Sequence, residues 1–228
     1  MAAFTKTVLL ASVLAASASL VAADSSCDTS ALNTTTGTYY IAQENTTIFD
    51  VAAATNRGVC DIGRVNCMAD VTIVPNVGQN IVIPPEVCEP DNDSCLLPTT
   101  PSNNTCVNGG PRLYYTVNGD TYERIAQRLN ITVDSLLNGN ASATEVLPVG
   151  QFVKVPLCEP SQCILQPYQF TYGVYKDLAE KYGSTVGQIM MLSPTYNYSE
   201  YTLNGNVAPT IDLPINCTAL SKNVTVIS

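Results

Sequence analysis

The stretch Tyr115-Thr-Val-Asn-Gly-Asp-Thr-Tyr-Glu-Arg-Ile-Ala126 decides the fold, because its pattern occurs three times in the chain. In each copy, side chains at positions i, i+3, i+4 and i+7 form one face of a predicted helix, a pattern typical of core packing. The matching positions are Ile48, Val51, Ala52 and Thr55; Tyr122, Ile125, Ala126 and Leu129; and Tyr175, Leu178, Ala179 and Tyr182. Each copy is followed by an extended segment that ends in proline. The repetition indicates one small module used three times, and such a chain usually binds a repetitive partner.

We assign the three modules to residues 38–84, 113–156 and 168–214. Residues 89–105 are rich in Pro, Asn, Ser and Thr and show no helical or strand period, so they are expected to form a linker. The connection between the second and third modules is only a few residues long. We therefore expect these two modules to lie close together and the first module to move more freely.

The second module shows the order of elements within the repeat. Residues 113–117 are predicted to form a strand, and Asp120 suits the N-cap of a helix with Glu123 at its third position, as in a capping box. Residues 132–137 favour a second short helix, and residues 150–156 alternate as a strand that stops at proline. The order strand, helix, helix, strand predicts an α+β fold in which the two strands pair antiparallel.

The nine cysteines fit this geometry. Antiparallel pairing of the first and last strands brings the two flanks of a module together. We therefore predict three flanking disulfides: Cys27–Cys88, Cys106–Cys158 and Cys163–Cys217. Cys60, Cys67 and Cys95 remain, and one of the three must be unpaired or bonded elsewhere; we predict Cys60–Cys95, which leaves Cys67. A module this small buries little apolar surface, so a disulfide worth about 2–4 kcal/mol matters to its stability.

The N-terminal residues predict secretion. Lys6 precedes an apolar run from Val8 to Leu20, and the small residues that follow predict cleavage after Ala23, which makes residues 1–23 a signal peptide. No later stretch is apolar enough to predict a membrane span, and the polar tail 218–228 argues against a lipid-anchor signal. The cysteine content agrees with an oxidising, extracellular compartment.

Nine Asn-x-Ser/Thr sequons predict a secreted glycoprotein. The positions expected to carry glycans are Asn33, Asn45, Asn92, Asn103, Asn130, Asn197, Asn216 and Asn223. The side-chain amides of Asn140, the ninth, and of Asn66 are expected to hydrogen-bond the backbone of the loop between helix and strand. The Asn140 sequon is therefore expected to stay unmodified.

Composition disfavours several classes of function. The formal net charge of −9 argues against binding to nucleic acids or to acidic membrane surfaces, so a neutral partner fits best. The chain contains no histidine, which excludes Ser-His and Cys-His nucleophiles and removes the commonest zinc ligand. Acidic residues such as Glu123 and Glu180 fall on predicted exposed helix faces rather than in a cleft. We expect no catalytic activity, no metal and no cofactor.

The second module resembles a LysM domain. The resemblance rests on Tyr115-x-Val-x-Gly-Asp-Thr-Tyr122-x-x-Ile-Ala126, then Asn140, Leu147-Pro-Val-Gly-Gln151 and Val155-Pro156. The first module is similar but has Asn45-Thr46-Thr47 in place of Gly-Asp-Thr, and the third diverges most. Because the three modules cover most of the chain beyond residue 23, the protein resembles secreted fungal effectors with three LysM domains.

The resemblance implies binding to polymers of β-1,4-linked N-acetylglucosamine, above all chitin and its oligosaccharides. In LysM domains the sugar lies between a loop after the first strand and a loop before the last. By position these loops correspond to Gly119, Asp120, Thr121, Tyr122, Thr144, Glu145 and Val146 in the second module; Asn45, Thr46, Thr47, Ile48, Thr72, Ile73 and Val74 in the first; and Tyr172, Gly173, Val174 and Tyr175 in the third. Asp120 is also expected to cap its helix, and a glycan on Asn45 would obstruct the first groove.

The expected function is that of a secreted chitin-binding effector without catalytic activity. It would sequester chitin fragments from host immune receptors or shield hyphae from chitinases. The alternatives are a structural protein anchored to its own wall chitin and a peptidoglycan-binding module. Repetition of the groove predicts avidity for a polymer, within one molecule or by ligand-bridged self-association.

Overall fold

The computed structural model describes residues 36–99, 104, 106–107, 109, 112–137, 141–193 and 210–219 as mixed α/β structure. The predicted signal peptide 1–23 lies outside these residues. Outside them as well lie Cys27, Asn33, Asn103, Asn140, Asn197 and Asn223.

The first segment, residues 37–83, has the predicted order of elements. Strands β1 (Gly37–Tyr40) and β2 (Asn80–Ile83) pair antiparallel, with Gly37 opposite Ile83. Helices α1 (Ile48–Thr55) and α2 (Val59–Val65) lie between them in the sequence. Asn56 ends α1 in the left-handed conformation with φ 53°, which asparagine tolerates better than most residues.

The second segment, residues 106–158, differs from the prediction in its second helix. Strand β4 (Leu113–Tyr115) pairs with β5 (Phe152–Lys154), and α3 (Tyr122–Leu129) follows β4. The helix predicted at 132–137 is instead one 3-10 turn, η2 (Val133–Ser135). Thr132 makes no capping hydrogen bond to the backbone, and its hydroxyl lies 2.8 Å from that of Ser135. A short second pair, β3 (Cys106–Val107) with β6 (Leu157–Cys158), closes the segment.

The third segment, residues 162–218, begins earlier than the sequence indicated. Strands β7 (Gln162–Gln169) and β8 (Thr210–Thr218) pair antiparallel from Gln162 opposite Thr218 to Gln169 opposite Thr210. Helices α4 (Tyr175–Tyr182) and α5 (Val186–Leu192) follow β7. The predicted strand pairing therefore extends beyond residues 168–214 at both ends, because the cysteines at 163 and 217 lie within the strands.

Three disulfides within the described residues join the pairs that the sequence suggested: Cys60–Cys95, Cys106–Cys158 and Cys163–Cys217. Cys88 is also disulfide-bonded, whereas its predicted partner Cys27 lies outside the described residues. Cys67 is a fully buried thiol.

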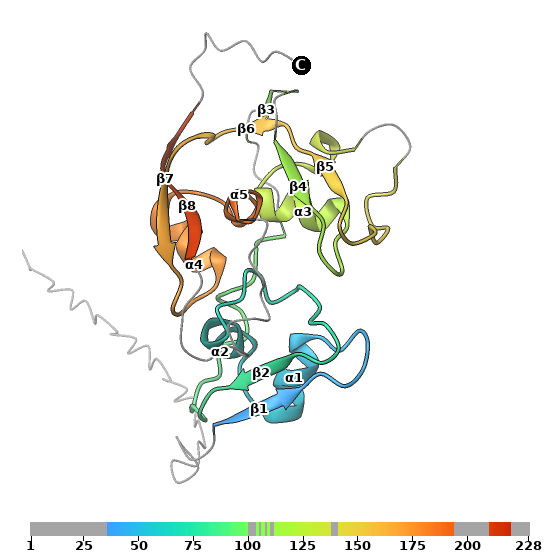
Figure 1. Ribbon diagram of the computed structural model, residues 1–228, viewed down its shortest axis with the longest axis vertical. Helices are drawn as coiled ribbons and strands as arrows, with labels where there is room; N and C mark the ends of the chain where they lie inside the picture. The colour runs from blue at the N-terminus through green and yellow to red at the C-terminus, as the bar shows by residue number, and fades with distance from the viewer. Residues whose placement is uncertain are drawn as a thin grey trace, which may run out of the picture.

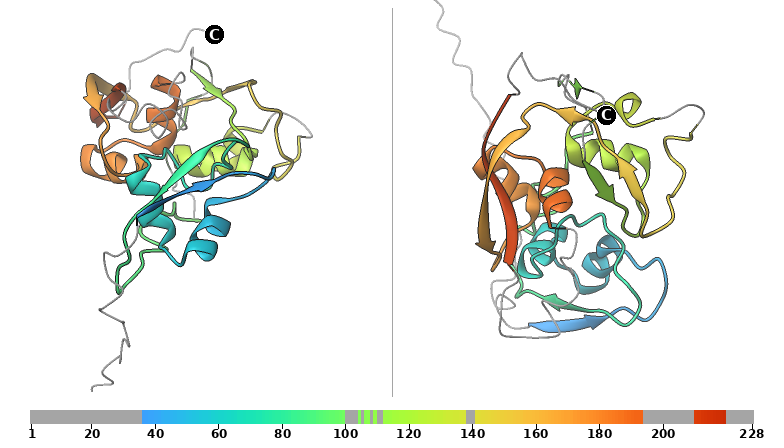
Figure 2. Two further views of the ribbon diagram at one scale, coloured as in Figure 1. Left: turned by 60° about the horizontal axis from the view of Figure 1, so that its bottom comes forward. Right: turned by 45° about the horizontal axis from the view of Figure 1, so that its top comes forward.

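The three segments pack against one another, and α5 lies near the centre, in contact with α3, β4 and β8 (Figure 1). Two of the hydrophobic clusters cross the segments. Ile73 of the first segment belongs to the cluster that includes Tyr114 and Ile189, and Val174 of the third belongs to the cluster of the first. Both views of Figure 2 show the blue and teal first segment lying directly against the other two.

The expected freedom of the first segment is therefore wrong. Arg64 on α2 forms an ion pair with Asp177 on α4, with Nε 3.0 Å from Oδ2. It forms a second ion pair with Asp91, with Nη1 2.7 Å from Oδ2. The predicted linker takes part in this packing as well. Cys95 is disulfide-bonded to α2, and the carbonyl of Leu97 accepts a hydrogen bond of 3.1 Å from Gln127 on α3.

Candidate functional site

The two loops that were predicted to bind sugar in the second segment lie side by side. The amide of Leu147 donates to the carbonyl of Asp120 at 2.7 Å, and the amide of Glu123 donates to the carbonyl of Ala143 at 3.0 Å. Thr121 from the first loop and Thr144 from the second line the same hollow, which has a volume of about 450 Å³. The fold thus brings one predicted residue from each loop, Thr121 and Thr144, to the same concave surface.

Asp120 does not have the role that the sequence suggested. The N-cap of α3 is Thr121, whose hydroxyl accepts a hydrogen bond of 3.1 Å from the amide of Arg124. Asp120 is fully buried one position earlier, and its carboxylate accepts from the amide of Val117 at 2.8 Å. It therefore shapes the loop from beneath and offers no side-chain surface to a ligand.

The same carboxylate belongs to a buried ion cluster, here named the Arg128 cluster and made of Arg128, Asp70, Asp120 and Tyr114. Arg128 lies on α3 and is 1% exposed. It forms an ion pair with Asp120, and its Nε is 2.7 Å from the carboxylate of Asp70 in the first segment. Its Nη1 donates to the hydroxyl of Tyr114 at 2.8 Å. Burial alone would raise the pKa of Asp70, but Arg128 and hydrogen bonds from Thr72 hold it below its ordinary value. The cluster fixes the first loop of the second segment against the first segment.

Among the predicted sugar contacts of the second segment, the exposed ones lie in its second loop. Thr144, Glu145 and Val146 are exposed, and Val146 shows 63% of its surface. Gly119 and Tyr122 are half-buried, and Gly119 has φ 84°, which favours glycine. The side chains that can meet a sugar therefore come mainly from residues 144–146.

In the first segment the predicted loops are exposed to different degrees. Asn45 is exposed and adopts φ 63°, whereas Ile48 is fully buried in the core. Thr47 caps α1 in a box with Asp50: the amide of Thr47 donates to Asp50 at 2.8 Å, and the amide of Asp50 donates to the hydroxyl of Thr47 at 3.2 Å. Thr46 donates its hydroxyl hydrogen to the carbonyl of Gln43 at 2.9 Å.

The second loop of the first segment lies against the first loop of the second segment. Ile73 is buried, and the carbonyl of Val74 accepts a long hydrogen bond of 3.4 Å from Asn118. A Cβ atom placed on Gly119 would lie 3.4 Å from Cγ2 of Val74. Thr72 supports the Arg128 cluster by donating its amide and hydroxyl hydrogens to Asp70, both at 2.8 Å. These residues therefore join two segments as well as flanking a predicted groove.

In the third segment only Tyr172 is accessible among the predicted residues, with 62% of its surface exposed. Gly173, Val174 and Tyr175 are buried, and the amide of Gly173 donates to the carbonyl of Arg64 at 3.0 Å. The sequence did not predict that this loop lies against α2 of the first segment.

The part of the chain that the structure describes contains no group of three or more His, Cys, Asp or Glu side chains that could hold a metal ion. The helices described there are too short or too polar to cross a bilayer.

Comparison with known proteins identifies the family. The LysM domain family matches residues 114–156, which coincide with the second predicted module. Over 220 residues the chain is 47% identical to the secreted LysM effector LysM13 of Penicillium expansum, covering 93% of this chain and 94% of that protein. It is 35% identical over 208 residues to the secreted LysM effector ECP6 of Passalora fulva, covering 89% of this chain and 87% of that protein. The chain therefore belongs to the family of secreted LysM effectors.

Proposed function

We propose that the protein binds chitin oligosaccharides and thereby sequesters chitin fragments or shields hyphal chitin. As a secreted LysM effector it is a secreted protein without enzymatic activity. The observation that carries the proposal is the paired loop surface of the second segment, which lies within the residues that the LysM family matches. We extend the proposal to three LysM modules, because the first and third segments repeat the strand, helix, helix, strand order.

The chemistry of the second segment suits an uncharged N-acetyl sugar. An acetamide offers one donor, one acceptor and one methyl group. The hydroxyl of Thr144 and the backbone of residues 144–146 supply polar partners, and the exposed side chain of Val146 supplies an apolar contact. Each neutral hydrogen bond contributes only about 0.5–1.5 kcal/mol, so one such surface binds modestly.

The other two segments present fewer accessible positions for sugar. In the first segment Asn45 is exposed and Thr46 and Thr47 are half-buried, and in the third Tyr172 is exposed. We propose these residues as the side-chain contacts of those segments. A glycan on Asn45 would cover the first of these surfaces, so occupancy of that sequon would weaken binding there.

Sedimentation with insoluble polysaccharides tests the proposal. We expect the protein to sediment with chitin but not with cellulose, and to prefer chitin to peptidoglycan. Replacing Thr144 and Val146 together by arginine should lower binding of chitin oligosaccharides, because it removes both proposed side-chain contacts. Both side chains are exposed, so the fold should stay intact. The matched control is Asp134→Arg on η2, an exposed position that does not line the hollow with Thr121 and Thr144.

The result that would overturn the proposal is failure of the wild-type protein to sediment with chitin. A protein that binds chitin but neither suppresses a host response to chitin fragments nor protects hyphae from chitinase would instead fit a structural role in the wall.

A further inference from the structure

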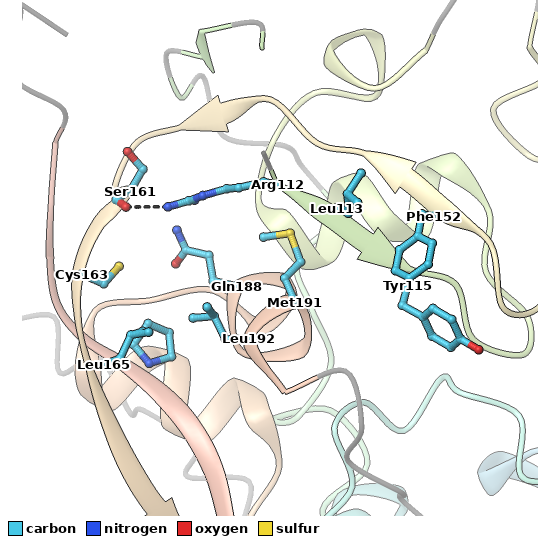
Figure 3. Close-up of a pocket in the computed structure, with 11 residues that line it drawn as sticks. Arg112, Leu113, Tyr115, Phe152, Ser161, Cys163, Leu165, Gln188, Met191 and Leu192 are labelled. Carbon is cyan, nitrogen blue, oxygen red and sulfur yellow. Dashed lines mark hydrogen bonds between the residues drawn. The ribbon is translucent and has the colours of Figure 1, made fainter. Parts of the chain in front are cut away.

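A pocket that shares no residue with the predicted sugar loops lies between the second and third segments. It has a volume of about 480 Å³ and is lined by β4, β5, β7, β8 and α5 (Figure 3). This volume falls within the range of about 300–1,000 Å³ that is typical of sites for small organic ligands. The residues used below are Arg112, Leu113, Phe152, Leu165, Met191 and Leu192.

The walls of this pocket are predominantly apolar, although Ser161 and Gln188 also line it. Met191 and Leu192 project from α5, while Leu165 stands on β7, and Figure 3 shows them facing the same space as Leu113 and Phe152. Leu113, Phe152 and Leu165 remain 45%, 64% and 52% exposed. Large apolar side chains that gather around a concavity and stay exposed are typical of a binding site rather than of an ordinary surface.

Among the residues that the structure describes, Arg112 is the only charged one that lines this pocket. One Nη2 hydrogen is donated to the carbonyl of Ser161 at 2.6 Å, and no ion pair to Arg112 occurs among the residues that the structure describes. A guanidinium carries five N–H donors and stays charged, so most of its hydrogen-bonding capacity is available. Burial lowers the pKa of Arg112, which agrees with a cation that lacks a carboxylate partner.

Arg112 lacks a carboxylate partner although acidic residues outnumber basic ones by 19 to 10. Arg57, Arg64 and Arg128 form ion pairs with carboxylates, whereas Arg112 and Arg124 form none among the described residues. Arg112 is also held in place by its own backbone, because its carbonyl accepts from the amide of Val155 at 3.1 Å. A fixed guanidinium at one end of an apolar pocket matches a ligand that combines a carboxylate with a hydrocarbon body.

We propose that this pocket binds an amphipathic monocarboxylate of the medium-chain fatty acid class. The carboxylate pairs with Arg112, and the aliphatic chain lies against Met191, Leu192 and Leu165 on one side and Leu113 and Phe152 on the other. The site is separate from the predicted sugar loops, so it does not depend on the proposed binding of chitin.

Calorimetric titration of the full secreted chain with decanoate tests this site. Affinity should rise about fourfold per methylene from octanoate to decanoate, because each buried methylene contributes a constant increment. Decyltrimethylammonium should not bind, since Arg112 repels its charge. Arg112→Gln should weaken decanoate binding at least tenfold, and Arg112→Lys should weaken it less. The control, Lys154→Gln, removes an exposed cation from neighbouring strand β5 and should leave the affinity unchanged.

Methyl resonances of isotope-labelled methionine locate the ligand. Met191 lines the pocket, whereas Met68 is buried in the cluster of the first segment, so decanoate should shift the Met191 signal and leave that of Met68 in place. Chitin sedimentation and thermal unfolding of the Arg112 variants show whether they fold. The proposal is overturned if decanoate produces no heat and no Met191 shift, if decyltrimethylammonium binds as tightly as decanoate, or if folded Arg112→Gln binds decanoate like the wild type.

Discussion

Replacing Arg128 by methionine tests whether the Arg128 cluster holds the first and second segments together. In the wild type the guanidinium neutralises Asp70 and Asp120 in a site where both carboxylates are buried. Methionine is apolar and fills much of the same space, so the variant loses the cation without leaving a large void. The two carboxylates then remain in the protein interior without a counterion.

The loss of unfolding free energy depends on the hydrogen bonds that each carboxylate retains. Removing one member of a buried ion pair costs about 3–5 kcal/mol, because the remaining charge is uncompensated. Asp70 retains two hydrogen bonds from Thr72 at 2.8 Å, and Asp120 retains one from Val117 at 2.8 Å. These bonds place the expected loss near the lower end, about 3 kcal/mol of unfolding free energy. For a chain of this size that loss lowers the melting temperature by about 6–12 °C.

Denaturant unfolding followed by far-UV circular dichroism, with the disulfides intact, measures this loss. The variant that combines Arg128→Met with Asp70→Asn and Asp120→Asn should be more stable than Arg128→Met alone, because it buries no unpaired charge. A single variant within about 1 kcal/mol of the wild type, well below the range expected for a broken buried pair, would refute the reasoning.

The pH dependence of the same variant provides a second check. The pKa of Asp70 is lowered in the folded protein, so its stabilising contribution is present above the pKa of an ordinary carboxyl group and is lost as the pH falls through the folded value. In Arg128→Met, protonation instead removes the unpaired charge of Asp70. The difference in unfolding free energy between the two proteins should therefore narrow between pH 7 and about pH 4. A constant difference over this interval would contradict the assignment.

Three further changes test the local structure. Thr47→Ala removes the N-cap of α1 and should lower the unfolding free energy by about 1 kcal/mol, measured by denaturant titration. Asn66→Ala removes a buried side-chain oxygen that accepts a hydrogen bond of 2.8 Å from the backbone N–H of Val82. The change should lower the unfolding free energy by about 1–3 kcal/mol and speed hydrogen exchange at the Val82 N–H. Unchanged exchange at Val82 would argue against this bond. Replacing Cys60 and Cys95 together by alanine should cost about 3–4 kcal/mol, with the melting temperature as the measurement, because their disulfide closes a loop across 35 residues.

The repeated elements could be predicted because their signals are local. The stripe at Ile125, Ala126 and Leu129 is buried as its spacing indicated. The N-cap of α3 was placed one residue too early, because Asp120 and Thr121 are both good N-cap residues and the pattern alone does not separate them. Because Asp120 was assigned as the N-cap, its burial and its contact with Arg128 were not predicted.

The Arg128 cluster could not be predicted in the same way. Asp70 is 58 residues from Arg128 in the sequence, and nothing local relates the two. One signal was present, since Arg128 lies three positions after Ile125 and so falls on the buried face of α3. A charged residue on such a face is expected to pair with an opposite charge. The contact between the third-segment loop and α2 could not be predicted from a comparable signal. Glycine is common in loops and valine is common in cores, so Gly173 and Val174 do not indicate a contact with another segment.

The packing between segments changes how the repeat can achieve avidity. Freely linked modules would adjust to any spacing of sugar units, with an effective concentration set by the linker. Here Arg64 ties the first segment to Asp177 of the third, and Arg128 ties the second segment to Asp70 of the first. The distances between the predicted sugar loops are therefore set by the fold. Two loops of one molecule can hold one polymer only where that fixed spacing fits the sugar chain, and elsewhere multivalent binding has to join separate molecules.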